Sequence, residues 1–251
     1  MAEAKLKVKL LAQTPEALKV IYSAARQCYS SYAAGDIFDE ANEDDKIQSF
    51  IEKILASGHE SPLEHVSFTF AIEGISRVCS HQLVRHRVAS FSQQSQRYVR
   101  ELDFDYIVPE SIKIDAEIKN IFEDLLSDIQ KSYNKILELL KNRGISGERA
   151  NQDVRFILPG ACETKIVMTM NLRELIHFFN LRLCTRAQWE IRALAQEMLK
   201  ICKDCFPDLF KRVDAKCVSL GYCPEDEKLS CGRYKTKKSL LETINQGGVE
   251  L

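Results

Sequence analysis

Apolar and polar residues alternate with a period of two in a few short segments of the chain. Residues 65–73 give the clearest case, because Val66, Phe68, Phe70 and Ile72 share one face while polar residues occupy the other. Shorter runs of the same kind lie at residues 5–11, 106–108 and 165–170. We expect four strands at these positions.

Most of the remaining chain has helical periodicity. Residues 115–142 predict a long amphipathic helix ended by Gly144, with a buried stripe that we expect to consist of Ile118, Ile121, Phe122, Leu125, Ile129, Tyr133, Ile136 and Leu140. Further helices are expected at 75–84, 148–158, 172–182 and 186–205, and one at 45–57 that Gly58 ends.

The segment near the N-terminus contains a helix start and a turn-rich stretch. Thr14 is placed to cap a helix, Pro15 suits its first turn, and Glu16 suits its positive end. The acidic residues 35–45 are expected to form a loop. Long amphipathic helices with a small, largely antiparallel sheet indicate an α+β fold. No glycine-rich dinucleotide fingerprint occurs in the sequence, which argues against a Rossmann fold.

Composition narrows the class of protein. The chain of 251 residues is 45% hydrophobic and 28% charged, as in ordinary soluble globular proteins. Lys plus Arg total 35 against 36 Asp plus Glu, a balance that disfavours nucleic acid or an acidic membrane as partner. We find neither a secretory signal nor an apolar run long enough to span a bilayer.

Nine cysteines, an odd number, favour reduced thiols in the cytoplasm over a disulfide framework. Five of them lie late in the chain, and four of these could ligate zinc or an iron–sulfur cluster: Cys202, Cys205, Cys217, Cys223 and Cys231. Their intervals do not match a compact paired motif, so we expect buried or free thiols and no metal.

Residues 85–97 carry the strongest chemical signal. Arg85, His86 and Arg87 precede a run of hydroxyl and amide side chains that ends at Arg97. Such a mixture suits a ligand that has a phosphate and a heterocycle with polar edges. The alternative is a solvated basic face at the end of a helix.

The spacing of Arg85-His86-Arg87, seven further residues, Ser95 and then Arg97 resembles the signature of the flavin-dependent thymidylate synthases. The resemblance implies an enzyme that converts dUMP to dTMP with FAD, with NADPH as reductant and methylenetetrahydrofolate as carbon donor. It implies a homotetramer with active sites at subunit interfaces. It assigns residues 1–210 to the family domain and leaves residues 211–251 as a cysteine-containing tail of unknown role.

Two more segments extend the resemblance. Residues 171–182 place Arg173 and His177 one helical turn apart, with Asn171 at the expected helix start and Leu172 in the core stripe. Residues 58–65 contain two histidines, but Pro62 and their separation rule out a zinc-binding helix. Either segment alone is more typical of a surface helix or a structural turn.

The resemblance assigns roles by position. It implies that FAD contacts His59, Ser61, Arg85, His86, Arg87, Gln93, Asn171, Leu172, Arg173 and His177. It implies that the nucleotide contacts Gln82, Leu83, Val84, Arg85, Gln93, Gln94, Ser95, Gln96, Arg97, Arg155 and Arg182. Arg182 becomes the catalytic residue, since a guanidinium beside the uracil would stabilise negative charge that develops on the ring.

Two alternatives remain. A nucleic-acid-binding module would place Arg85, Arg87, Arg97 and Arg100 on phosphates, but such modules usually have a basic domain. A flavoprotein with a different substrate is the other, because the flavin site is better marked than the folate site. Ser95 has no recognisable general base, so we assign it a binding role.

Overall fold

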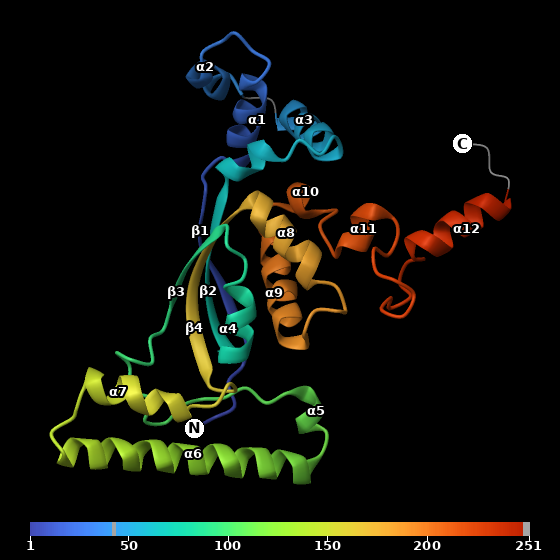
Figure 1. Ribbon diagram of the computed structural model, residues 1–251. Coiled ribbons are helices and arrows are strands. Elements are labelled where there is room, and N and C mark those ends of the chain that lie inside the picture. The colour runs from blue at the N-terminus through green and yellow to red at the C-terminus, as the bar shows by residue number, and fades with distance from the viewer. Residues whose placement is uncertain (42–43, 248–251) are drawn as a thin grey trace. The chain divides into compact units, whose positions relative to one another are not determined.

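The computed structural model describes residues 1–41 and 44–247 (Figure 1). Four strands form one antiparallel sheet in the order β1-β2-β4-β3. Their bounds are β1 Lys7–Gln13, β2 Ser67–Ser76, β3 Ala89–Gln93 and β4 Glu163–Asn171. The α+β fold is confirmed, as is the absence of a Rossmann arrangement.

Helices make up most of the rest of the described chain. Before the second strand come α1 Ala17–Gln27, α2 Ala34–Asp39, α3 Asp44–Ala56 and the 3-10 helix η1 Ser61–His65. Between β2 and β4 come α4 Arg77–Leu83, α5 Glu110–Lys113, α6 Ala116–Asn142, α7 Glu148–Val154 and η2 Arg155–Ile157. After β4 come α8 Leu172–Arg182, α9 Trp189–Cys205, α10 Pro207–Phe210, α11 Lys216–Leu220 and α12 Lys237–Gly247. Among the described helices, none combines the length and apolarity needed to cross a lipid bilayer.

The chain divides into two compact units. Unit 1 comprises residues 1–9 and 70–168, and unit 2 comprises residues 10–69 and 169–251. Each unit therefore combines segments that are distant in the sequence. The signature residues 85–97 belong to unit 1, whereas α8 and the tail belong to unit 2.

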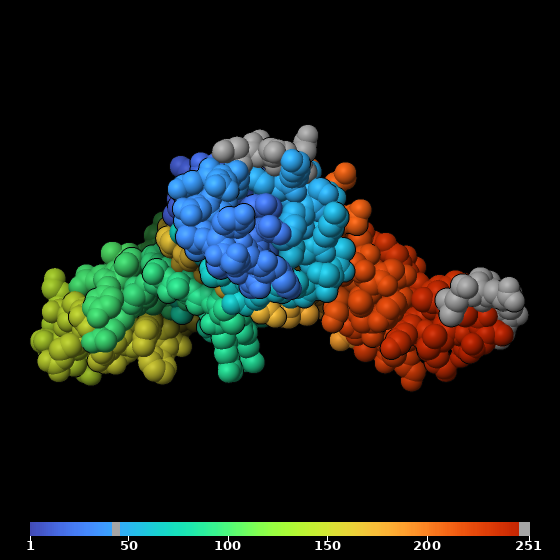
Figure 2. Space-filling model, turned by 90° about the horizontal axis from the view of Figure 1, so that it is seen from above, coloured from blue at the N-terminus to red at the C-terminus, as the bar shows by residue number. Residues whose placement is uncertain are grey.

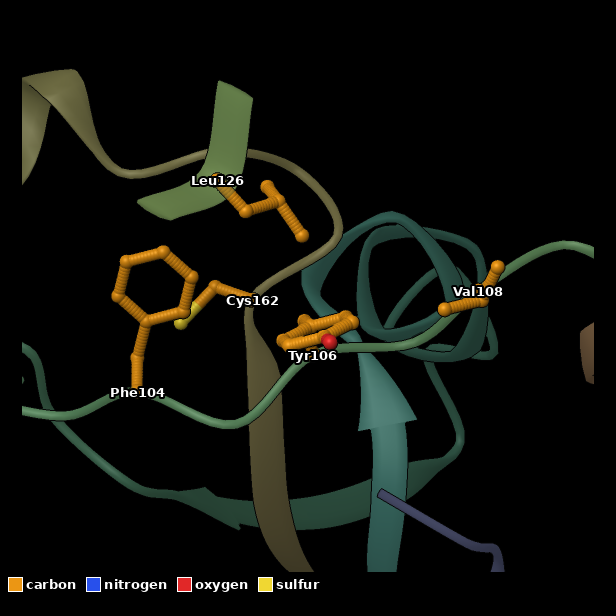
Figure 3. Close-up of a cluster of buried hydrophobic side chains, with 5 residues drawn as sticks. All are labelled: Phe104, Tyr106, Val108, Leu126 and Cys162. Atoms are coloured by element: carbon orange, nitrogen blue, oxygen red, sulfur yellow. The ribbon is translucent and has the colours of Figure 1, made fainter. Parts of the chain in front are cut away.

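Unit 1 has an apolar cluster beside α6. Figure 3 shows the sulfur of Cys162 beside the ring of Phe104, with Tyr106, Val108 and Leu126 completing the cluster. Tyr106 forms isolated bridges to Glu3 and Cys162, so the expected strand at 106–108 is reduced to single pairings. These pairings hold the residues before α5 in the core.

The core of unit 2 contains aromatic rings that pack edge to face. The Phe68 ring lies edge-on to Phe206 and Phe210, with centroid separations of 5.9 and 5.8 Å, and Phe210 also lies edge-on to Phe179 at 6.2 Å. Helices α8 and α9 lie side by side (Figure 1). Strand β2 and helix α8 are thereby packed on α10 and its N-cap residue Phe206.

The structure corrects the expected start of the first helix. The Thr14 hydroxyl accepts a hydrogen bond from the amide of Ser67 at 2.9 Å and does not cap α1. Glu16 occupies the N-cap position with φ of 48°. Thr14 thus joins two distant segments, because its hydroxyl finds a partner in β2.

Two loop predictions also differ from the structure. Helix α2 (Ala34–Asp39) overlaps the segment 35–45 expected to be a loop, whose residues 42–43 are outside the described part of the chain. Strand β3 follows the arginine triplet directly, where no strand was predicted. Its five residues are too few to show a clear period.

The orientation of α6 was predicted correctly only in part. Its length agrees with the prediction, and Tyr133 of the expected stripe is buried, but the other buried residues are Leu126, Gln130 and Leu137. From the expected stripe, the side chains of Ile118, Ile121 and Leu125 are 48%, 64% and 59% exposed. The helix carries apolar residues on two sides, and its packing covers only one of them.

Candidate functional site

In unit 1 the arginine triplet follows directly from the end of α4. The Ser76 hydroxyl caps this helix by accepting from the amide of Cys79 at 3.0 Å. At the other end, the amides of Arg85 and His86 donate to the carbonyls of Gln82 and Leu83. The chain therefore leaves the helix in a tight turn.

The three side chains of the triplet have different environments. His86 is buried, whereas Arg85 and Arg87 are exposed. The imidazole lies inside the turn that carries the two guanidinium groups. This arrangement suits anion binding, because the exposed cations are presented from a structured turn.

The amide side chains after the triplet are used within the fold. Gln93 donates to the hydroxyls of Ser80 and Thr164, both at 3.0 Å, and so links β3 to α4 and β4. Gln96 donates to the sulfur of Cys162 at 3.6 Å. The expected ligand contacts of Gln93 and Gln96 would therefore depend on their remaining carbonyl oxygens.

Ser95 organises the turn before Arg97. Its hydroxyl accepts from the amide of Arg97 at 3.2 Å, and its carbonyl accepts from the amide of Val99 at 2.9 Å. The preceding residue, Gln94, donates its amide to the carbonyl of Lys165 at 2.9 Å. This turn directs the chain from the sheet towards α7.

Arg97 contacts α7 in two ways. Its guanidinium pairs with Glu148, and its carbonyl accepts from the side chain of Asn151 at 3.1 Å. Arg155, just after α7, donates to the carbonyl of Gln152 at 3.2 Å. The structure thus places two predicted nucleotide contacts, Arg97 and Arg155, at this one helix.

Asn151 was missed in the sequence analysis. It is 2% exposed, and its carbonyl oxygen Oδ1 is buried without a hydrogen-bond partner in the described part of the chain. A buried oxygen of this kind normally has a donor, and a ligand or water can supply one. A single asparagine in a polar helix gave no sequence signal for this position.

In unit 2 the histidine-containing turn contacts the first turn of α8. Arg173 donates to Glu60 at 3.3 Å and pairs with Glu64. The hydrogen bond with Glu64 raises the pKa of the Arg173 guanidinium, which keeps it charged. His59, on the same turn, lies edge-on to Tyr29 with ring centroids 6.4 Å apart.

Two predicted FAD contacts, His59 and Ser61, are therefore on the turn that binds a third, Arg173. No role was predicted from the sequence for Glu60 or Glu64. A role for these two acids could have been inferred from their spacing of four residues and from their position in the segment that contains the predicted contacts His59 and Ser61. A phosphate approaching Arg173 would have to compete with these two carboxylates.

The predicted site residues of helix α8 lie on different faces of the helix, some exposed and some buried. Asn171 caps the helix by accepting from the amide of Glu174 at 2.9 Å. Arg173 and His177 are exposed, whereas Leu172 is fully buried and its amide donates to the carbonyl of Val66 at 2.7 Å. Leu172 therefore serves the core, as does Leu83 at the end of α4.

Arg182 leaves α8 on another side. Each helical residue turns by about 100°, so the nine-residue separation from Arg173 places the two side chains on opposite sides of the helix axis. Arg182 is half-buried, in contrast to the exposed Arg173. One helix thus presents cations in two directions, which suits contact with two ligand groups.

Comparison with known proteins places the chain in a family. Residues 9–208 match the family model described as thymidylate synthase complementing protein. A flavin-dependent thymidylate synthase of Nitratidesulfovibrio vulgaris is 52% identical over 244 residues, covering 96% of this chain and all of that protein. The enzyme of the same name from Clostridium tetani is 47% identical, covering 94% of this chain and 96% of its own.

A solved structure confirms the fold. It is a UMP/dUMP methylase, PolB from Streptomyces cacaoi, bound with 5-Br dUMP. The TM-score is 0.67 at 24% sequence identity, with 84% of this chain and 95% of that chain covered. With identities near half over almost the whole length, the chain belongs to the family of flavin-dependent thymidylate synthases.

Proposed function

We propose that the protein catalyses the reductive methylation of dUMP to dTMP, with bound FAD, methylenetetrahydrofolate as carbon donor and NADPH as reductant. The observation that carries the proposal is the match to the family over residues 9–208, which includes every residue assigned above. The dUMP analogue bound to the structural neighbour supports the choice of nucleotide.

The chemistry of the donor set fits a flavin that bears phosphates. Exposed guanidinium groups at Arg85 and Arg87, and Arg173 beside a capped helix start, are suitable for anionic oxygens. His59, Ser61 and His177 add further hydrogen-bonding groups in unit 2. Reduced FAD, when bound, would supply the hydride that converts the transferred carbon into a methyl group.

The roles of the arginines follow from their positions. Arg97 and Arg155, both at α7, would bind the dianionic phosphate of the nucleotide, and the unpartnered Asn151 Oδ1 lies on the same helix. Arg182 points away from Arg173 and would stabilise negative charge on the uracil ring. The two faces of α8 would thereby serve the nucleotide and the flavin separately.

We also propose a homotetramer with active sites at subunit interfaces. The exposed stripe Ile118, Ile121 and Leu125 of α6 supports this, because soluble proteins seldom leave contiguous large apolar side chains in water. A second copy of the chain offers the same stripe, as a two-fold interface requires.

We assign residues 1–210 to the catalytic domain and residues 211–251 to a tail.

All nine cysteines are free thiols, which supports a cytoplasmic location, where thiols stay reduced.

A tritium-release assay tests the function. Nucleotide labelled at C5 should release tritium only with flavin-loaded protein, methylenetetrahydrofolate and a reductant, and NADPH should sustain turnover. dUMP should also accelerate reoxidation of the reduced flavin by methylenetetrahydrofolate. If dUMP leaves that rate unchanged, the protein is a flavoprotein with another substrate.

Arg182→Ala tests the catalytic assignment. We expect FAD to stay bound and turnover to fall by about 10²–10³-fold, because one charge-stabilising donor is lost. Arg143→Ala, which removes a cation at the end of α6, serves as control and should keep full turnover. Normal turnover of Arg182→Ala would remove Arg182 from the mechanism.

A further inference from the structure

Four cysteines of unit 2 line one cavity between the end of α8 and the tail. The cavity has a volume of about 110 Å³ and is lined by Cys184, Cys217, Cys223 and Cys231, among other residues. In Figure 2 the described residues of the tail are coloured orange-red to red. The two other late cysteines are elsewhere, with Cys202 buried in α9 and Cys205 exposed at its end.

The four thiols differ in accessibility. Cys217 and Cys223 are buried, Cys184 is half-buried and Cys231 is exposed. Burial raises the pKa of Cys217, so this thiol stays protonated at neutral pH. Solvent therefore reaches Cys231 most easily and Cys184 next.

Cys231 has the environment of a reactive thiol. Its sulfur accepts hydrogen bonds from the backbone amide of Arg233 and from the hydroxyl of Thr185, and these bonds lower the pKa of the thiol. Lys216, Arg186 and Arg233 also line the cavity, although Glu225 pairs with Arg186 at 3.6 Å and Asp214 pairs with Arg233 at 2.8 Å. An exposed cysteine with such partners is more often a thiolate than a free cysteine in water.

Cys184 lines the same cavity as Cys231. Thr185, which donates to Cys231, directly follows Cys184 in the chain. The hydrogen bond thereby holds the tail against the backbone of residues 184–185. Among the other three cysteines of the cavity, Cys184 is the most accessible, whereas Cys217 and Cys223 are buried.

We propose that Cys231 is a site of reversible thiol oxidation and that Cys184 is its resolving thiol. The oxidant class is a low-molecular-weight disulfide such as oxidised glutathione. The Cys231 thiolate attacks one sulfur of that disulfide, forms a mixed disulfide and expels one thiolate. The Cys184 thiolate then attacks the Cys231 sulfur, forms the Cys184–Cys231 disulfide and expels the second thiolate.

Electrons and protons balance over these two reaction steps. Two protein thiols lose two electrons and two protons in total, and one small disulfide gains both to become two thiols. The product links the tail to the residue two positions after Arg182. This inference does not depend on the substrate of the enzyme.

Thiol mapping on the full-length protein tests the proposal. Reduced protein is mixed with oxidised glutathione, free thiols are trapped with iodoacetamide, and digested peptides are assigned by mass spectrometry. We expect glutathione first on Cys231 and then a peptide containing the Cys184–Cys231 disulfide, which dithiothreitol reverses. Cys184→Ser should stop at glutathionylated Cys231, whereas Cys231→Ser should form no cross-link.

Cys28 provides a matched control within the same protein. It is an exposed thiol at the end of α1, away from the cysteines of the cavity in sequence, and its sulfur donates to the carbonyl of Ala24. At neutral pH we expect Cys231 to react about tenfold faster than Cys28. Thr185→Val should raise the midpoint of the pH–rate profile of Cys231 and leave that of Cys28 unchanged.

Three results would overturn the proposal. Cys28 could react as fast as Cys231, or the disulfide could join Cys217 to Cys223. Stoichiometric zinc or iron bound to the purified protein and lost in Cys231→Ser would show instead that the thiols are metal ligands. Within the described residues, no three cysteine, histidine or carboxylate side chains are grouped to hold an ion.

Discussion

Among the glycines in the described part of the chain, Gly74 has the least room for a side chain. A Cβ atom there would lie 2.0 Å from the carbonyl oxygen of Lys5, and the residue has φ of +70°. Gly74→Ala should therefore lower the free energy of unfolding by at least about 1–3 kcal/mol, measured by urea denaturation. Gly35→Ala is the control, because open space surrounds Gly35 in α2. Equal stabilities of the two variants would contradict this account.

Glu101 gives a prediction for pH. Burial, and next the charge of Glu163, raise the pKa of the Glu101 carboxyl above its ordinary 4.5, although Lys165 and Arg77 oppose the shift. The folded state therefore binds this proton more tightly than the unfolded state, and stability is lost as pH rises through the raised pKa. Glu101→Gln removes the ionisation and should raise Tm at pH 7.5.

The comparison across pH makes the test specific. The gain in Tm should vanish near pH 4, where Glu101 is protonated in both states. Glu138→Gln, at an exposed carboxylate that pairs with Lys135 at 2.9 Å, should give no gain at either pH. A constant difference between Glu101→Gln and the native chain at all pH values would refute the assigned cause.

At the scale of elements, α6 shows how one helix can carry two apolar faces. One face packs Leu126, Tyr133 and Leu137 against the rest of unit 1, while the other exposes Ile121 and Leu125. The periodic pattern predicted the helix and its length correctly. It could not rank the two faces, because both repeat at helical spacing.

The exposed face predicts an effect on assembly. Ile121→Glu with Leu125→Glu should reduce the molar mass of the assembly, measured by light scattering after gel filtration, because charges would enter an apolar interface. Helical circular dichroism should stay unchanged. The control pair, Asn120→Glu with Lys131→Glu on other sides of α6, should keep the native mass. A native mass for the first pair would rule out this face as the interface.

At the scale of the whole molecule, the core of unit 2 extends past the family match. The match ends at residue 208, yet Phe210 is fully buried and lies edge-on to Phe68 and Phe179. The chain just beyond the family match is therefore part of the fold. Ala215, Cys217 and Cys223 are buried as well.

Phe210→Ala should therefore destabilise unit 2 strongly. Loss of a buried aromatic ring leaves a cavity and costs about 3–5 kcal/mol, which thermal and urea unfolding would detect. Phe156→Ala is the matched control, since that ring is 84% exposed and its loss should change Tm little. A small effect of Phe210→Ala would mean that α10 contributes little to stability.

By itself, the sequence determined the fold class, most helix positions and the family. These features rest on local information: periodicity in residues 65–73 and 115–142, and the spacing from Arg85 to Arg97. Such patterns involve residues that are close in the sequence, so they can be recognised without knowledge of contacts to distant segments. The same local reasoning identified Asn171 as the start of α8, which the Asn171 side chain caps.

Only the tertiary structure decided which partner each polar group takes. Thr14 bonds to Ser67 instead of capping a helix, Gln93 links three elements, and Arg173 meets Glu60 and Glu64 more than a hundred residues away in sequence. It likewise gathered Cys184 and the tail cysteines around one cavity. The physical reason is that hydrogen bonds and burial depend on distances in space, and spacing along the chain does not fix the distances between remote segments.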